Sequence, residues 1–275
     1  MRKLFCEISP LTYKISVFKC RLKRHVENIR SKESFSKEKN NDPLPVVIYS
    51  QKSLIRRKLG NVDLQLQENK AVNLSLSAPK VNGVMIKPGE TFSFWKLVGS
   101  CTARKGYKTG LVISKGTTGT GVGGGMCQFT NLIHWLVLHT PLEIVEHHHH
   151  DELDLFPDYG RQIPFGTGTS IMYNYLDYRF RNNTDMNFQI IVHTDDKYLI
   201  GEIRAEKPLD VSYHVGVENE AFVKRDDGFY RVGTVYRDVV DKKTGNVLSR
   251  DLIRVNNAKV MYELPQENNL SNLIL

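Results

Sequence analysis

The stretch GVGGGMCQFTNLIHWLVLHT, residues 121–140, decides the fold class, because three glycines run directly into a segment that is apolar on nearly every side. A helix with apolar groups nearly all round is buried on most sides. Pro141 sets its end. We therefore expect a buried helix that starts near Met126 at a glycine-rich loop, in which six of residues 116–125 are glycine.

The flanking sequence predicts strands and turns. Residues 46–50 and 111–114 are short apolar stretches typical of strands, and 68–82 has the apolar spacing of a helix before Gly83. From residue 171 onward, short strands alternate with turn sequences such as NNTD and DDG, which is typical of antiparallel hairpins. The sequence thus predicts an α+β fold: a mostly antiparallel sheet packed on the buried helix, with a β-rich C-terminal half.

Composition divides the chain in two. Of its 275 residues, 40% are hydrophobic and 25% are charged, which is ordinary for a globular protein. Residues 1–39 hold 11 Lys and Arg against 4 acids, so this segment carries +7 of the total charge of +8. We expect a basic N-terminal segment and linker at 1–43, and an α+β domain at 44–275 in which 207–275 could form a β-rich subdomain.

The basic segment indicates where the protein resides. If residues 11–30 are helical, Leu11, Ile15, Phe18 and Leu22 share a face between basic side chains, which suits an anionic membrane surface or an acidic partner. The alternative is a solvated helix laid on the domain's own surface. No nucleic-acid-binding motif accompanies the charge, so nucleic acid is not an expected partner. Without a secretory signal, a long apolar span or a CxxC pair, we expect a cytoplasmic protein, peripheral to the membrane at most.

Cys127 is the candidate nucleophile, because the first turn of a helix stabilises a thiolate and lowers its pKa. Amide groups left bare by glycine could bind an oxyanion, and a histidine on the following strand could act as the base. The candidate catalytic residues are Cys127, His147, His148, His149, His150 and Asp177, the last to orient a histidine. The candidate oxyanion and substrate-binding residues are Gly123, Gly124, Gly125 and Gln128.

Other interpretations of the same residues stay open. Cys127 could be a small buried hydrophobe, with the glycines allowing close packing, and the histidines a solvated strand end. Gly119, Gly121 and Gly124 fit a dinucleotide-binding pattern with Glu146 for a ribose, but KGTT separates them from the preceding strand. Four consecutive histidines lack the spacing of metal ligands, so neither a metal nor a cofactor is expected.

Four sequence blocks resemble the VanW family, known from B-type vancomycin resistance clusters: IKPGETFSFWKLVG (86–99), GGGMCQFTNLIHWLVLHTPLEIVEHHHH (123–150), LFPDYGRQIPFGTGTSIMYNYLDYRFRNNTDMNFQI (155–190) and LIGEIRAEKPL (199–209). The resemblance implies a link to the cell envelope and to glycopeptide resistance, with a peptide-like or cell-wall-precursor ligand. Many family members carry an aspartate at the position of Gly168, so this chain departs from the family there.

Two hypotheses follow. In the first, Cys127 carries out acyl transfer or amide hydrolysis on a peptide-like substrate, with one of the histidines as its base. In the second, the glycine loop and the β-rich half form a non-catalytic binding module or scaffold at the cytoplasmic membrane surface.

Overall fold

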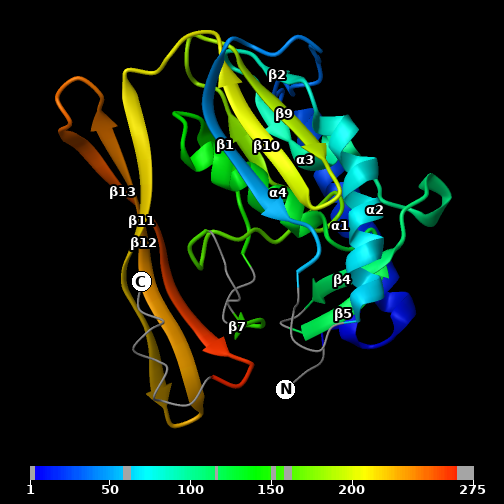
Figure 1. Cartoon of the computed structure of the whole chain (residues 1–275). Helices are drawn as coiled ribbons and strands as arrows, with labels where there is room; N and C mark the ends of the chain where they lie inside the picture. Colours follow the sequence, from blue (N-terminus) through cyan, green and yellow to red (C-terminus); the bar gives the residue numbers. More distant parts are fainter. Residues whose placement is uncertain (1–3, 58–62, 115–116, 150–152, 158–162, 265–275) are drawn as a thin grey trace.

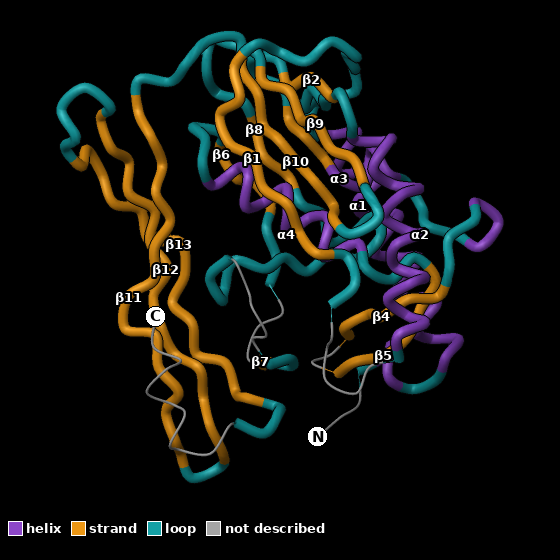
Figure 2. The backbone as a smooth tube through the Cα atoms, in the orientation of Figure 1, coloured by secondary structure: helices purple, strands orange, loops and turns teal. Residues whose placement is uncertain are grey.

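A four-stranded antiparallel sheet of order β1-β10-β9-β2 lies at the centre of the molecule (Figures 1 and 2). The structure is a computed structural model that describes residues 4–57, 63–114, 117–149, 153–157 and 163–264. Its helices are η1 (Phe5–Glu7), α1 (Pro10–Arg30), α2 (Leu64–Val81), α3 (Phe94–Val98), η2 (Ala103–Lys105) and α4 (Met126–Leu138). Its strands are β1 (Val46–Leu54), β2 (Val84–Ile86), β3 (Thr91–Ser93), β4 (Thr109–Ser114), β5 (Thr117–Val122), β6 (Glu143–Glu146), β7 (Leu153–Asp154), β8 (Arg179–Arg181), β9 (Phe188–Thr194), β10 (Tyr198–Ala205), β11 (Val211–Arg225), β12 (Gly228–Asp241) and β13 (Val247–Val260).

The predicted α+β fold is confirmed, and α4 is its buried helix. It starts at Met126, as the glycine run predicts, and packs on β1 and β10. Gly201 of β10 lets the helix approach closely, because a Cβ there would lie 3.0 Å from both Leu132 and Leu136. Apolar side chains on several sides of α4 lie in the hydrophobic core, and their burial stabilises the fold.

The second long helix, α2, covers the same sheet but buries an unexpected face. It packs against β9 and β4, and its buried positions include the polar Gln67, Lys70, Asn73 and Ser77. By contrast, the apolar Val72 is 39% exposed. A polar row at spacings of three and four therefore faces the interior.

Most of the predicted glycine loop is a strand. Residues Thr117–Val122 form β5, which pairs antiparallel with β4, so that Val112 lies over Gly119 and Gly121. The loop itself consists of residues 123–125. The dinucleotide interpretation is thereby wrong, since two of its glycines lie in a hairpin rather than in a tight turn between a strand and a helix.

The C-terminal half is β-rich, as expected, but its strands are longer than the sequence indicates. β11, β12 and β13 form an antiparallel ribbon of 14–15 residues a strand, and β7 adds to it in parallel (Figure 1). A smaller sheet of order β3-β8-β6 contains β8, the first named strand after residue 171, where the sequence predicts that the β pattern begins. Whether 207–275 forms a separate subdomain stays a prediction.

The basic segment is helical and its continuation is hydrogen-bonded to the domain. α1 has no buried residue, and its serine N-cap and Pro10 mark its start. Residues 34–40, predicted as linker, run along β3 and β2: the Ser36 amide donates to the Thr91 carbonyl and the Met85 amide to the Glu38 carbonyl. Among the described residues, no helix is long and apolar enough to span a bilayer.

Candidate functional site

A cavity of about 980 Å³ opens at the N-terminal end of α4 and brings the sequence motifs together. We call it the α4 cavity; it lies between residues 121–128, the segment 163–173, the ends of β1 and α2, and β13. Its charged lining is almost wholly positive: Arg21, Lys52, Arg57, Lys70 and Arg254, against the single acid Asp154 among the described residues. Asp154 is already engaged, since it accepts a hydrogen bond from Tyr262.

The three glycines before α4 are required for close packing. A Cβ on Gly124 would lie 2.4 Å from the Gly110 carbonyl carbon, and one on Gly123 would lie 2.4 Å from Cys101 Cβ. Gly125 is the N-cap residue, with φ +99° in the left-handed region, and its missing Cβ makes room for the stem of Lys70. Asn73 fixes this loop by donating to the Gly124 carbonyl over 2.9 Å.

Cys127 lines the cavity, but its thiol is not activated as expected. The prediction was a pKa lowered by the helix terminus. Burial instead raises the pKa of the thiol, and a hydrogen bond from the Ile171 backbone offsets this only in part. The prediction of a lowered pKa is therefore wrong, because desolvation outweighs the helix dipole.

The predicted oxyanion donors are mostly occupied. Gln128 gives its amide hydrogens to the Ser53 hydroxyl and to the Leu54 carbonyl, both over 2.9 Å. The Gly123 and Gly124 amides donate to the carbonyls of Lys108 and Gly121. Within the described chain, the N–H groups of Gly125 and Met126 have no acceptor, and both residues line the cavity.

The histidines follow β6 rather than extend it, and they separate into two groups. The ring of His147 lies 3.9 Å from that of His149 and 4.1 Å from that of His134, and its Nε2 donates to the Gly168 carbonyl over 3.0 Å. The carbonyl of Gly168 thus bonds to a histidine. His149 lines the α4 cavity, whereas His148 turns to Glu146; His150 lies outside the described residues.

His134, seven residues after Cys127 on α4, lies fully inside the protein. It bonds to Tyr178 through Nδ1 over 3.1 Å, and burial lowers its pKa well below the usual value. It is the inner member of the histidine group.

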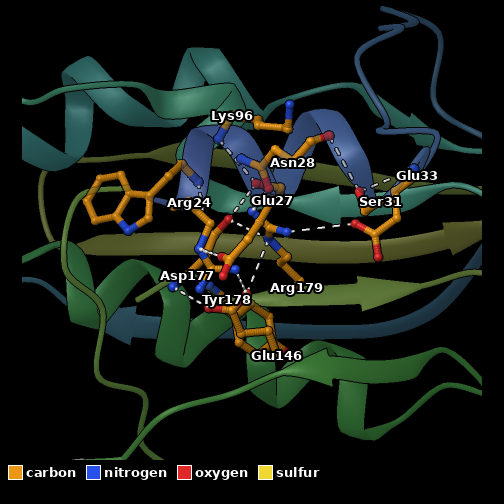
Figure 3. A network of polar contacts seen from close by, with 12 residues as sticks. Arg24, Glu27, Asn28, Ser31, Glu33, Lys96, Glu146, Asp177, Tyr178 and Arg179 are labelled. Carbon is orange, nitrogen blue, oxygen red and sulfur yellow. Dashed lines mark hydrogen bonds and ion pairs between the residues drawn. The ribbon is translucent and has the colours of Figure 1, made fainter. Parts of the chain in front are cut away.

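Asp177 belongs to a structural network rather than to the histidine group (Figure 3). Its carboxylate accepts from Ser93, the Trp95 amide and the Arg179 guanidinium, so no hydrogen bond between it and a described histidine is present. Residue 177 therefore orients the start of α3 and Arg179, and its predicted role of orienting a histidine has no support in this geometry.

Glu146 is the centre of that network and attaches α1 to the domain (Figure 3). It forms a bidentate pair with Arg24 of α1 at 2.6 and 2.8 Å. Burial opposes its ionisation, but the His148 hydrogen bond and the charges of Arg24 and Arg179 hold the pKa of Glu146 below its usual range. A ribose-binding role for Glu146 is excluded by these partners.

Lys70 is the functional candidate that the sequence did not reveal. It is 7% exposed, lines the cavity beside Gly125, and makes no hydrogen bond or ion pair with any described residue. Burial, followed by repulsion from Arg57 and Arg56, lowers its pKa to about 7. The only sequence signal was the polar spacing of Gln67, Lys70 and Asn73, which apolar periodicity overlooks.

The fold and the site define a class: a small α+β protein with a cavity, lined mostly by positive charges, at the start of a buried helix. The chain belongs to the VanW family. A sequence profile described as "VanW like protein" matches residues 69–204. The Vancomycin B-type resistance protein VanW of Enterococcus faecalis is 36% identical over 223 residues, which cover 81% of each chain.

The Uncharacterized protein YoaR of Bacillus subtilis is 34% identical over 118 residues, which cover 42% of this chain and 36% of that protein. No solved structure matches the chain. The resemblance seen in the sequence blocks is confirmed, and three of those blocks supply walls of the α4 cavity: residues 95, 123–128 and 163–173.

Proposed function

We propose that the protein binds a peptide-like cell-wall precursor in the α4 cavity, without covalent chemistry, while α1 holds it at an anionic membrane surface. The observation that carries the proposal is the cavity itself, of about 980 Å³, to which three of the family's sequence blocks contribute. The name of the Enterococcus relative, a vancomycin resistance protein, supports a ligand from the cell wall. The cytoplasmic side of the membrane stays a prediction from the sequence.

Binding without catalysis is favoured, because residues that a thiol mechanism would need have a raised pKa or other hydrogen-bond partners. Burial raises the pKa of Cys127, Gln128 bonds to β1, and Asp177 bonds to Arg179. Cys127→Ser should therefore keep ligand binding and the cellular phenotype.

Thiol-dependent acyl transfer is the second candidate, favoured by one observation: Cys127 and His149 line the same cavity. It is supported if Cys127→Ser loses the phenotype while it still folds and binds ligand. Trapping of an acylated Cys127 by mass spectrometry would point the same way.

The binding proposal is tested by calorimetric titration with soluble peptidoglycan fragments. Gly168 lines the cavity, and a Cβ there would meet only Asn131 Oδ1 at 3.9 Å, so Gly168→Leu fills space without backbone strain. Gly216→Leu is the matched control, because Gly216 lies outside the cavity and has nothing within 4 Å. We expect Gly168→Leu to lose binding and Gly216→Leu to retain it. A wild-type protein that binds none of the fragments contradicts the proposal.

The membrane part rests on the exposed face of α1. Leu11, Ile15, Phe18, Leu22 and Ile29 lie on one stripe, each 48–67% exposed. Arg24 and Asn28, on another side of the helix, attach it to the domain. Lys14, Lys19 and Lys23 flank the stripe and are exposed. An apolar stripe between cations is the pattern of a helix lying in a lipid interface.

Vesicle co-sedimentation tests this part. We expect binding to vesicles that contain phosphatidylglycerol and weak binding to pure phosphatidylcholine, with loss at high salt. Phe18→Ser should weaken binding by roughly tenfold or more, since burying such a side chain contributes about 1.5–3 kcal/mol. Leu248→Ser is the control, because Leu248 is 60% exposed on β13, far along the chain from α1. Equal binding by both variants would remove the membrane assignment.

A further inference from the structure

We infer that the α4 cavity contains an anion subsite, in which Lys70 and the unpaired N–H groups at the start of α4 hold an oxyanion of the ligand, a carboxylate or a phosphate. The inference rests on the proposed function and names the chemical group that the cavity selects. The subsite shares Gly125 with the predicted oxyanion site, but the other predicted donors of that site, Gly123, Gly124 and Gln128, are already hydrogen-bonded.

Lys70 provides the first half of the subsite. Its stem packs on Gly125, the N-cap residue of α4, where an added Cβ would lie 2.3 Å from Lys70 Cγ. It is 7% exposed and has no acceptor among the described residues, while the charges that act on it, Arg57 and Arg56, are repulsive. A largely buried ammonium with only repulsive charges acting on it is unfavourable, and an anion in the adjoining cavity would supply the missing partner.

The start of α4 provides the second half. This helix has 13 residues and no side-chain cap at its N-cap, so its amides are left for water or a ligand. The N–H groups of Gly125 and Met126 have no acceptor in the described chain, and both residues line the cavity with Lys70. Unpaired amides and the positive end of the helix dipole favour a negative charge at this place.

The wider cavity favours the same ligand. Its described charged lining is cationic except for Asp154, whose carboxylate is bonded to Tyr262 and lies 3.6 Å from Arg231. Field lines from several cations in a concave surface raise the local concentration of an anionic ligand.

The test is calorimetric titration of the full chain with three probes: N-acetyl-alanyl-alanine, its C-terminal amide, and inorganic phosphate. We expect the free acid to bind about tenfold or more tightly than the amide, and Lys70→Met to abolish this preference. Lys70→Arg should keep it. Lys197→Met is the charge control, because Lys197 is exposed and lies outside the cavity. Phosphate that displaces the acid assigns the subsite to phosphate esters; an acid that phosphate cannot displace assigns it to carboxylates.

A pH series adds a readout that a structural lysine would not give. Lys70 has a pKa of about 7, so the preference for the acid should fall between about pH 6 and pH 8.5 in the wild type and stay level in Lys70→Arg. His149→Gln separates the titration of His149 from that of Lys70. The other charged groups and thiols of the cavity lining, together with Arg56 that acts on Lys70, are Arg21, Lys52, Arg57, Cys101, Cys127, Asp154 and Arg254. Equal binding of acid and amide by the wild type overturns the anion subsite but leaves the proposed function standing. Absence of any binding, with peptidoglycan fragments included, overturns both.

Discussion

Replacing Lys70 by methionine should make the protein more stable while it loses anion binding. Methionine keeps the length of the stem that packs on Gly125 and removes the buried charge. Burial and the neighbouring arginines lower the pKa of Lys70 from 10.5 to about 7. Since one pH unit corresponds to about 1.36 kcal/mol, the charged form costs the folded state up to about 5 kcal/mol below pH 7.

The pH dependence of stability shows the sign of the contribution that Lys70 makes to the free energy of unfolding. Above pH 7 the folded chain releases the Lys70 proton, whereas the unfolded chain keeps it until about pH 10.5, so wild-type stability gains from this residue as pH rises. Lys70→Met should therefore exceed the wild type most at about pH 6, and the difference should shrink toward pH 10. Urea unfolding, followed by the fluorescence of the buried Trp95 and Trp135, measures both quantities.

Lys197→Met is again the control, and an exposed lysine of this kind should change stability by no more than about 0.5 kcal/mol. A Lys70→Met variant that is less stable than the wild type at about pH 6 would refute the reasoning, because Lys70 would then stabilise the fold. A stability difference that is the same at both ends of the pH range would refute it too.

Three further predictions concern the glycine loop, α1 and the thiol. Gly124→Ala should lower the free energy of unfolding by roughly 2–3 kcal/mol, measured in urea, because its Cβ would meet Gly110 backbone that cannot move aside. Glu146→Gln should release α1 from the domain, because Arg24 loses its bidentate partner, and faster tryptic cleavage within residues 10–30 would detect the release. Low pH should release α1 as well. The pKa of Glu146 is lowered in the folded state, so the stability that its carboxylate contributes is lost as the pH falls through that pKa. Cys127 should be alkylated by iodoacetamide only above the pH range of an ordinary thiol, followed by peptide mass spectrometry; rapid alkylation at neutral pH would contradict the raised pKa and restore the catalytic hypothesis.

The sequence predicts elements well where one physical signal dominates. The helix at 126–138 is apolar nearly all round, and no other structure would bury Phe129, Leu132 and Leu136 together. The hairpins of the C-terminal half follow from turn sequences such as DDG. The length of these strands was underestimated, because the ribbon pairs through half-buried side chains whose apolar pattern is weak.

Prediction failed where a local pattern has two physical meanings. Glycine at 119 and 121 indicates a loop when taken alone, but alternation with threonine also makes a strand on which Val112 can lie. For α2, the spacing of apolar residues predicts that the side with Val72 is buried, whereas the side that faces the cavity carries polar residues. Polar residues on an inner face carry no hydrophobic signal.

The candidate site was predicted in its location but not in its chemistry. Residues 123–128 and His149 do line one cavity, as the motif suggested. Which groups are already hydrogen-bonded depends on partners distant in the sequence, such as Ser53 for Gln128 and Ser93 for Asp177. Lys70 could not be identified as a site residue from the sequence, because its burial results from the packing of segments that are distant in the sequence.

Residues 34–40 have a consequence for anyone who shortens this chain. Their backbone forms four hydrogen bonds with β2, β3 and the adjoining Gly83, through Ser34, Ser36, Glu38 and Asn40. A fragment that begins at residue 44 would leave the partner amides and carbonyls of β2, β3 and Gly83 unpaired. Unpaired groups at a sheet edge readily form hydrogen bonds with strands of other molecules. A shortened chain for crystallisation should therefore keep residues 34–40. Without them, self-association through the exposed strands could be mistaken for a native assembly.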